Sequence, residues 1–147
     1  MSQNRLITAL RERNLFLAWV VASTALVGSL YFSEIAGFVP CELCWYQRVL
    51  MYPLFLLLGI ANFRRDRSVT YYALPFTIVG GSLSLFHYAM QKTGWFSSFS
   101  PCAEGVPCSG EYINWLGFIT IPFLALVAFI LIGWLLWIGR KVEDSFR

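Results

Sequence analysis

The sequence predicts an all-α integral membrane protein, a bundle of four transmembrane helices forming a single domain over residues 1–147. The first observation is composition: 58% of the residues are hydrophobic and only 13% are charged. The charged share is about half of the roughly 25% that is typical of soluble globular domains. The second is the presence of four long apolar runs. A helix of roughly 20 apolar residues crosses a hydrocarbon core about 30 Å thick. No linker-like or low-complexity segment divides the chain.

The predicted spans follow from the apolar runs, at residues 15–32, 45–63, 69–90 and 116–139. Each is expected to be a helix, because backbone groups in lipid must be hydrogen-bonded within the protein. Pro53, Pro75 and Pro122 fall inside spans, where a helix bundle tolerates kinks. The first run exceeds the roughly 7–15 apolar residues of a signal peptide and precedes no clear A-x-A site. We therefore expect it to be a retained helix.

Lysine and arginine are distributed unevenly among the connections. Nine of the 11 lie in the N-terminal tail, the link between the second and third spans, and the C-terminal tail: Arg5, Arg11, Arg13, Arg64, Arg65, Arg67, Arg140, Lys141 and Arg147. Only Arg48 and Lys92 belong to the other two connections. Because cytoplasmic loops carry the excess of basic residues, both termini are expected in the cytoplasm, with residues 33–44 and 91–115 outside. The scattered basic residues and modest net charge of +3 argue against a nucleic acid partner.

All four cysteines fall in the two outward segments, as the pairs CELC (Cys41 and Cys44) and CAEGVPC (Cys102 and Cys108). Disulfides persist outside the cytoplasm. Two structural disulfides are one interpretation, although closing so short a loop removes little chain entropy. A four-thiolate zinc site is another, but an oxidising compartment and the wider second gap disfavour it, so we expect no metal. Haem attachment requires C-x-x-C-H, and Trp45 follows Cys44.

The stretch CELCWYQR places reactive groups at the membrane boundary. Pro40 restricts the entry turn, and Cys44 follows at the start of the second span, where the helix N-terminus favours the reactive thiolate. Arg48 lies one turn further along the same face and can stabilise that thiolate or an oxygen gaining negative charge. A snorkelling arginine is the alternative. A thiol pair here suits a lipid-soluble acceptor, and a quinone accepts the two electrons that a dithiol supplies.

Two polar residues are further candidates for contacts with the quinone. His87, the only histidine, lies near the outward end of the third span. Ionisable groups inside a span usually face the bundle interior or a site, so His87 is either a site residue or a core histidine bonded to a backbone carbonyl. Gln47 is the second candidate, with an ordinary interface residue as its alternative. Gln91, one turn beyond His87, can join the same surface.

Other outward residues receive simpler interpretations. Trp45 fits the aromatic belt at a membrane interface. The loop acids Glu34, Glu104 and Glu111 are expected to be solvated, with no catalytic part.

Four spans, two outward cysteine pairs and the string CELCWYQR resemble the disulfide bond formation protein B (DsbB) family. The likeness is closest to its short Gram-positive branch, disulfide formation protein C (BdbC-like), to which VPCSGEYINWLGFITIP is also similar; it covers roughly residues 10–140. The resemblance implies a quinone-dependent thiol oxidase of the cell membrane, using menaquinone or ubiquinone. It would reoxidise a thioredoxin-like extracytoplasmic disulfide oxidase (DsbA- or BdbD-like) and so support disulfide formation in exported proteins.

The resemblance also implies roles for the individual cysteines. Cys41 and Cys44 would be the quinone-coupled pair, with Cys44 touching the quinone beside Arg48. Cys102 would form the mixed disulfide with the partner, and Cys108 would bridge to Cys41. The longer branch has a wider gap between its second pair, so the order of exchange is open here. Two other classes also stay open: a non-catalytic four-span scaffold with structural disulfides, and a conduit for electrons from cytoplasmic thiols, which this chain lacks on the inner side.

Overall fold

The computed structural model describes residues 2–66, 68–93, 102, 106–111 and 113–144. The helical elements in chain order are α1 (Ser2–Leu30), the π-helical turn η1 (Tyr31–Ile35), α2 (Glu42–Arg64), α3 (Val69–Thr93) and α4 (Ile121–Asp144). Within the described ranges, the only strand-like feature is an isolated antiparallel bridge between Trp115 and Ile119. The predicted all-α fold is confirmed.

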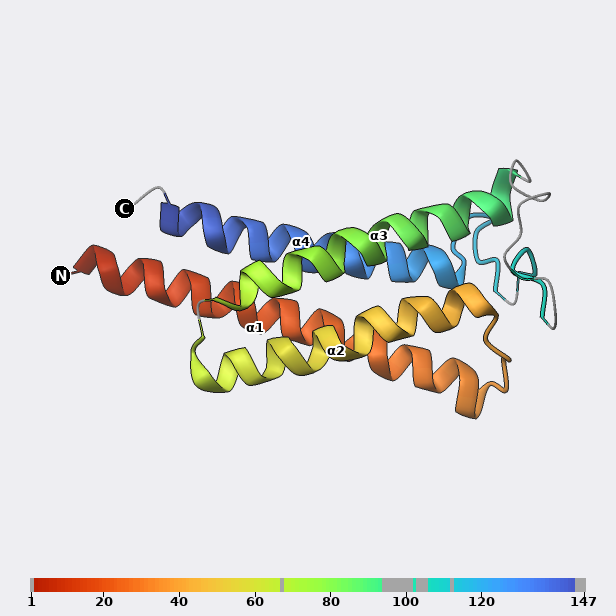
Figure 1. Ribbon diagram of the computed structural model, residues 1–147, viewed down its shortest axis with the longest axis horizontal. Helices are drawn as coiled ribbons and strands as arrows, with labels where there is room; N and C mark the ends of the chain where they lie inside the picture. Colours follow the sequence, from red (N-terminus) through yellow and green to blue (C-terminus); the bar gives the residue numbers. More distant parts are fainter. Residues whose placement is uncertain (1, 67, 94–101, 103–105, 112, 145–147) are drawn as a thin grey trace.

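The four long helices alternate in direction along the chain and lie side by side (Figure 1). α1 and α3 each pack against both α2 and α4, so that the helices form a ring. The start of α1, the end of α4 and the α2–α3 turn lie at one end of the bundle (Figure 1). The α1–α2 connection and the α3–α4 connection lie at the opposite end, which is the end that carries the cysteines.

Each of the four helices is long and apolar enough to cross a membrane. The qualifying segments are Thr8–Ile35, Glu42–Arg64, Val69–Thr93 and Ile121–Val142. Large apolar side chains cover their outer faces, among them Val49, Leu56, Ile78 and Trp134. A helix that is hydrophobic all round is typical of a membrane span. The chain is therefore a multi-pass membrane protein.

Small residues let the helices approach closely in the middle of the bundle. The central cluster includes the buried side chains of Leu54, Leu58, Phe129 and Ile132. A Cβ atom on Gly80 would overlap the ring of Phe129, and one on Gly59 would come within 2.9 Å of the indole nitrogen of Trp19. Because lipid is as apolar as the core, such close packing rather than water exclusion holds membrane helices together.

The last helix begins later than predicted, at Ile121 instead of Leu116. Leu116 and Gly117 have φ values of 55° and 81°, in the left-handed region that an α-helix does not use. Around them, Trp115 and Ile119 exchange two backbone hydrogen bonds of 3.1 and 2.9 Å. Hydropathy alone extended the span too far because this turn is itself apolar.

All three prolines lie inside helices as predicted, two of them in helix interiors and one in a first turn. Pro53 and Pro75 are interior to α2 and α3. Pro122 lies in the first turn of α4, where a backbone N–H would have no helical partner in any case, so it introduces no kink. At the cysteine end, α2 begins at Glu42 rather than at Trp45, which brings Cys44 into the first helical turn.

Candidate functional site

The CELC motif forms the N-terminus of α2. Cys41 is the N-cap residue, with an extended backbone (φ −73°, ψ 170°), and its carbonyl accepts the first helical hydrogen bond, from the Trp45 N–H. Cys44 lies in the first turn, whose backbone N–H groups have no helical partner and carry partial positive charge. The two sulfur atoms are 3.1 Å apart and unbonded. The local geometry predicted for Cys44 is thus present, with both sulfurs at the helix end.

His87 connects this pair to two distant parts of the chain. Its side chain is 1% exposed, and its Nδ1 atom lies 3.0 Å from the amide nitrogen of Gln47, which is also buried. Its Nε2 atom lies 3.2 Å from the carbonyl oxygen of Cys108 and 3.7 Å from Cys41 Sγ. Since an amide nitrogen donates only, Nδ1 accepts and the ring proton resides on Nε2. That proton points to both the Cys108 carbonyl and the Cys41 sulfur.

The surroundings of Cys41 favour its thiolate. The hydrogen bond from the Cys44 thiol, assisted by the His87 ring, outweighs burial and lowers the pKa of Cys41 to about 4. A thiolate accepts hydrogen bonds more strongly than a thiol, so donors that converge on the sulfur stabilise the ionised form. The sequence predicted that Cys44 is the cysteine whose thiolate is favoured. In the reduced pair, the structure instead gives Cys41 the larger set of hydrogen-bond donors.

The second cysteine pair is a disulfide, Cys102–Cys108. Cys108 is 1% exposed and belongs to a buried cluster with Cys41, Leu43 and Met90. Cys102 packs against the same cluster. The structure therefore brings all four cysteines together at one end of the bundle, although the two pairs are far apart in sequence.

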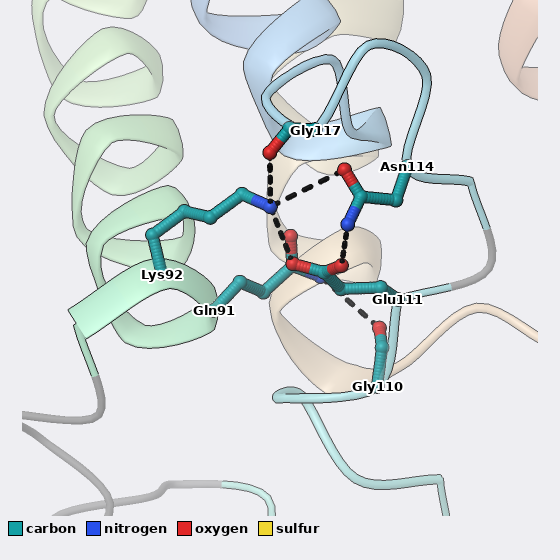
Figure 2. A network of polar contacts seen from close by, with 6 residues as sticks. All are labelled: Gln91, Lys92, Gly110, Glu111, Asn114 and Gly117. Atoms are coloured by element: carbon teal, nitrogen blue, oxygen red, sulfur yellow. Dashed lines mark hydrogen bonds and ion pairs between the residues drawn. The ribbon is translucent and has the colours of Figure 1, made fainter.

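The segment that follows Cys108 is held to the last turns of α3. Gln91 donates a hydrogen bond of 3.1 Å to the Gly110 carbonyl, and Lys92 forms an ion pair of 2.8 Å with Glu111 (Figure 2). Glu111 is exposed, as expected for a loop acid, but its oxygens also contact Lys92 and Asn114, which the sequence did not predict. Glu34 is exposed as expected, and Glu104 lies outside the described residues.

Arg48 points from α2 toward α1. Its Nη2 atom donates a 3.1 Å hydrogen bond to the Ser29 carbonyl, just before α1 widens into the π-helical turn η1. Its guanidinium carbon lies 5.3 Å from the centre of the Trp45 ring, a cation–π contact. Trp45 thus does more than fill an interfacial belt, because it restricts where the cation can lie.

A cavity of about 470 Å³ lies between α1, α2 and α4. Its polar wall includes Cys44, Gln47 and Arg48, and most of the remaining lining is apolar. Phe32, Phe38, Val39 and Pro40 line its end nearest the cysteines. A volume of 300–1,000 Å³ with an apolar lining and a few polar groups is typical of small-molecule sites. Cys44 is the only cysteine among the described residues that lines it.

A second, much smaller cavity of about 20 Å³ lies on the other side of Cys44. Cys41, Cys44, His87 and Gln91 line it from the helices, and Pro107 and Gly110 from the second loop. His87 lines this cavity and not the large one. The sequence placed His87 and Gln47 together with the quinone; in the structure Gln47 lies between the large cavity and His87, which faces Cys41 and Cys108.

Cys41, Cys44 and His87 offer ligand atoms within 4.8 Å of one another, a set that suits zinc. The four-thiolate zinc site considered from the sequence is not formed, because Cys102 and Cys108 are bonded to each other. The expectation of no metal cofactor stays a prediction.

Sequence reasoning missed several contacts of this end of the bundle. The Ser29 carbonyl, the α1 wall of the large cavity and the Lys92–Glu111 pair were not anticipated. The sequence did offer one indication of the Lys92–Glu111 pair. Lys92 is the only lysine or arginine between residues 91 and 120, so it is the only basic partner there for a loop acid.

Four membrane helices with two cysteine pairs gathered at one end, one of them a disulfide, define a membrane thiol–disulfide protein. The chain belongs to the family described as "Disulfide bond formation protein DsbB", whose profile matches residues 11–139. It thus has the disulfide-forming oxidoreductase role of that family.

Relatives place the chain in the short branch of the family. It is 64% identical over 118 residues to "Disulfide bond formation protein C" of Bacillus subtilis, covering 80% of this chain and 86% of the relative. It is 54% identical over 123 residues to "Probable disulfide formation protein C 1" of Bacillus cereus, covering 84% and 88%. A "Probable disulfide formation protein C" of Halalkalibacterium halodurans is 52% identical over 123 residues, covering 83% and 90%. No solved structure matches this chain significantly.

Proposed function

We propose that this protein oxidises a reduced thioredoxin-like partner outside the cytoplasm and passes the electrons to a quinone in the membrane. One observation carries the proposal. Cys44 lines a large apolar cavity that it shares with Arg48, while Cys41, on the other side, belongs to the buried cluster that contains Cys108. One cysteine of the pair therefore meets a lipid-soluble acceptor and the other meets the second cysteine pair.

The distribution of charge supports an extracytoplasmic site. Nine of the 11 lysines and arginines belong to the two tails and the link between α2 and α3, and the described parts of these segments lie at the end opposite the cysteines. Because basic residues are retained on the cytoplasmic side, the cysteine end faces outward. There, disulfides can form and persist.

The large cavity fits a quinone. Its volume of about 470 Å³ accommodates the ring and part of an apolar tail, and Arg48 is the one cationic group among the described residues of its wall. A bound quinone supplies a sink for two electrons and two protons. Arg48, held by the Ser29 carbonyl and the Trp45 ring, is a fixed donor at the place where negative charge develops on a ring oxygen. Menaquinone and ubiquinone both have such a ring and apolar tail, and both accept two electrons and two protons.

The thiol chemistry proceeds by disulfide exchange. A partner thiolate attacks Cys102, forms a mixed disulfide and releases Cys108 as a thiolate. Cys108 attacks Cys41 of the Cys41–Cys44 disulfide and frees Cys44 as a thiolate beside the cavity. The second partner thiol then resolves the mixed disulfide, and the released Cys102 displaces Cys41 from Cys108. Each step replaces one disulfide by another through thiolate attack.

The cycle closes when the reduced pair Cys41 and Cys44 is oxidised and two electrons and two protons reach the quinone. The sum is one partner disulfide and one hydroquinone for each partner dithiol and quinone. His87 supports this exchange by holding a proton at Nε2 between Cys41 and the Cys108 carbonyl. A quinone ~60 mV more oxidising than the partner would favour the forward direction ~100-fold.

The test is turnover of purified protein in detergent with a reduced extracytoplasmic thioredoxin-like protein and a water-soluble quinone analogue. We expect quinone absorbance to fall in proportion to partner oxidation, and Cys41→Ser and Cys44→Ser to abolish it. Well-folded protein that turns over no quinone, with disulfides inert to the reduced partner, would favour the scaffold instead. Labelling of single cysteines with a membrane-impermeant maleimide tests the orientation separately.

A further inference from the structure

The end of α3 holds the second cysteine segment through one cation. Lys92 Nζ lies 2.8 Å from Glu111 Oε1, 3.0 Å from the Gly117 carbonyl oxygen and 3.4 Å from Asn114 Oδ1 (Figure 2). These three acceptors come from separate points of the segment between Cys108 and α4. An ammonium group has three N–H donors, so Lys92 can satisfy all three partners at once.

The acceptors are themselves organised. The Asn114 amide nitrogen donates a 2.6 Å hydrogen bond to Glu111 Oε2, which leaves Oε1 facing Lys92 (Figure 2). The side chains of Lys92 and Glu111 are each 24% exposed, so the ion pair is partly shielded, although the network as a whole lies at the surface. Isolated pairs on a protein surface contribute little, but networks with several hydrogen bonds restrict geometry.

This network lies next to the redox groups along α3. Gln91, the residue before Lys92, donates to the Gly110 carbonyl, and His87, one turn earlier, contacts the Cys108 carbonyl. Cys108 and Cys41 belong to one buried cluster. Three side chains of α3 therefore hold the backbone carbonyls of Cys108, Gly110 and Gly117. The short backbone bridge at Trp115 and Ile119 is the only regular pairing among the described residues of this segment.

We propose that Lys92 is a positioning residue for the exchange between the two cysteine pairs. By fixing Glu111, Asn114 and Gly117 against α3, it keeps Cys108 at a high effective concentration near Cys41. The inference rests on the exchange step of the proposed function, but it concerns the distance between the two cysteines and needs neither quinone nor partner. Tethering two groups in the right geometry raises their effective concentration, and a small displacement lowers it steeply.

The experiment measures that effective concentration directly. The Cys44→Ala/Cys102→Ala protein keeps only Cys41 and Cys108, and is equilibrated in detergent with glutathione and glutathione disulfide. One glutathione disulfide is consumed and two glutathione molecules are released for each Cys41–Cys108 disulfide formed. The equilibrium constant for forming this disulfide measures the effective concentration of the two thiols. In this background we expect Lys92→Met to lower that equilibrium constant about tenfold. Lys141→Met, at the opposite end of the bundle, is the matched control and should change nothing.

Charge reversal separates positioning from general loss of structure. Lys92→Glu alone should lower the effective concentration, and the pair Lys92→Glu with Glu111→Lys should restore part of it, because the ion pair can form again while a carboxylate at position 92 cannot donate to the Gly117 carbonyl. If Lys92→Met does not fold, Glu111→Gln removes the charge with little change of shape and should show the same direction of effect. An unchanged constant in the folded Lys92 or Glu111 variants overturns the proposal. Absence of quinone turnover in the wild-type protein would leave this measurement unaffected, so the two failures are distinguishable.

Discussion

The Nε2 atom of His87 lies 3.7 Å from the Sγ atom of Cys41, and the two residues are 46 positions apart in sequence. The same nitrogen lies 3.2 Å from the Cys108 carbonyl, so one imidazole touches both cysteine segments. Gln47 holds the opposite ring nitrogen at 3.0 Å and thereby selects the tautomer. A group that stabilises a Cys41 thiolate also stabilises the reduced pair, which makes the Cys41–Cys44 disulfide a better oxidant of Cys108.

In the fully reduced protein, Cys41 should remain ionised well below neutral pH. The hydrogen bond from Cys44 and the contact with His87 lower the pKa of Cys41 to about 4. Because the pKa is lowered, the thiolate and the stability it confers on the folded dithiol state persist at neutral pH and are lost as the pH falls through about 4. Thiolate absorbance near 240 nm should follow that midpoint. Cys44→Ala should raise the midpoint by removing the largest contribution; a wild-type midpoint near the ordinary value would contradict the prediction.

Arg48→Met should impair quinone reduction without impairing thiol exchange. Among the residues that the structure describes, the guanidinium is the only cation on the wall of the large cavity, so its loss removes the donor to the developing oxyanion. Removing one such donor typically costs about 10²-fold in kcat. Turnover with a quinone analogue measures the loss, and transfer of the partner's electrons to Cys41 and Cys44 in quinone-free protein is the control. Arg48→Lys should retain part of the activity; equal turnover in the Met variant would show that Arg48 only anchors the helix.

Cys108→Ser should accumulate a covalent complex with the partner. Without Cys108, Cys102 is a free thiol, so the mixed disulfide forms with added oxidised partner: the Cys102 thiolate attacks the partner disulfide and releases the second partner thiolate. No Cys108 thiol is then present to displace the partner from Cys102. Non-reducing gel electrophoresis with mass spectrometry of the joined peptides identifies the bond. A complex joined through Cys41 instead would reverse the roles assigned to the two segments.

Gly80→Ala should destabilise the bundle, whereas Gly81→Ala should have little effect. A Cβ atom at Gly80 would overlap the Phe129 ring, while one at Gly81 would meet only Phe129 Cβ, at 3.8 Å. Overpacking of this kind costs about 1–3 kcal/mol. Thermal unfolding of both variants in the same detergent provides the comparison. Equal melting temperatures would mean that α3 and α4 can separate at no cost.

Local patterns were sufficient to predict the class of fold and to select candidate site residues. Four apolar runs specified four helices because lipid admits no unpaired backbone. The CELC motif and Arg48 predicted the groups at the start of the second helix, because residues three or four positions apart lie on the same face of a helix. The helix boundary was wrong at Leu116 because this apolar turn has the hydropathy of a helix but a left-handed backbone. The partners of Glu111 were missed because they are distant in sequence or lie in a segment without regular structure.

The sequence by itself determined that this chain crosses a membrane four times and that its sulfur atoms gather in two segments between helices. Only the tertiary structure decided which groups meet: His87 with Gln47, Cys41 and the Cys108 carbonyl, and Lys92 with Glu111. The reason is that periodicity describes one helix at a time. The rotation of each helix about its axis, and the path of a connection without regular structure, follow from the packing of all four helices together.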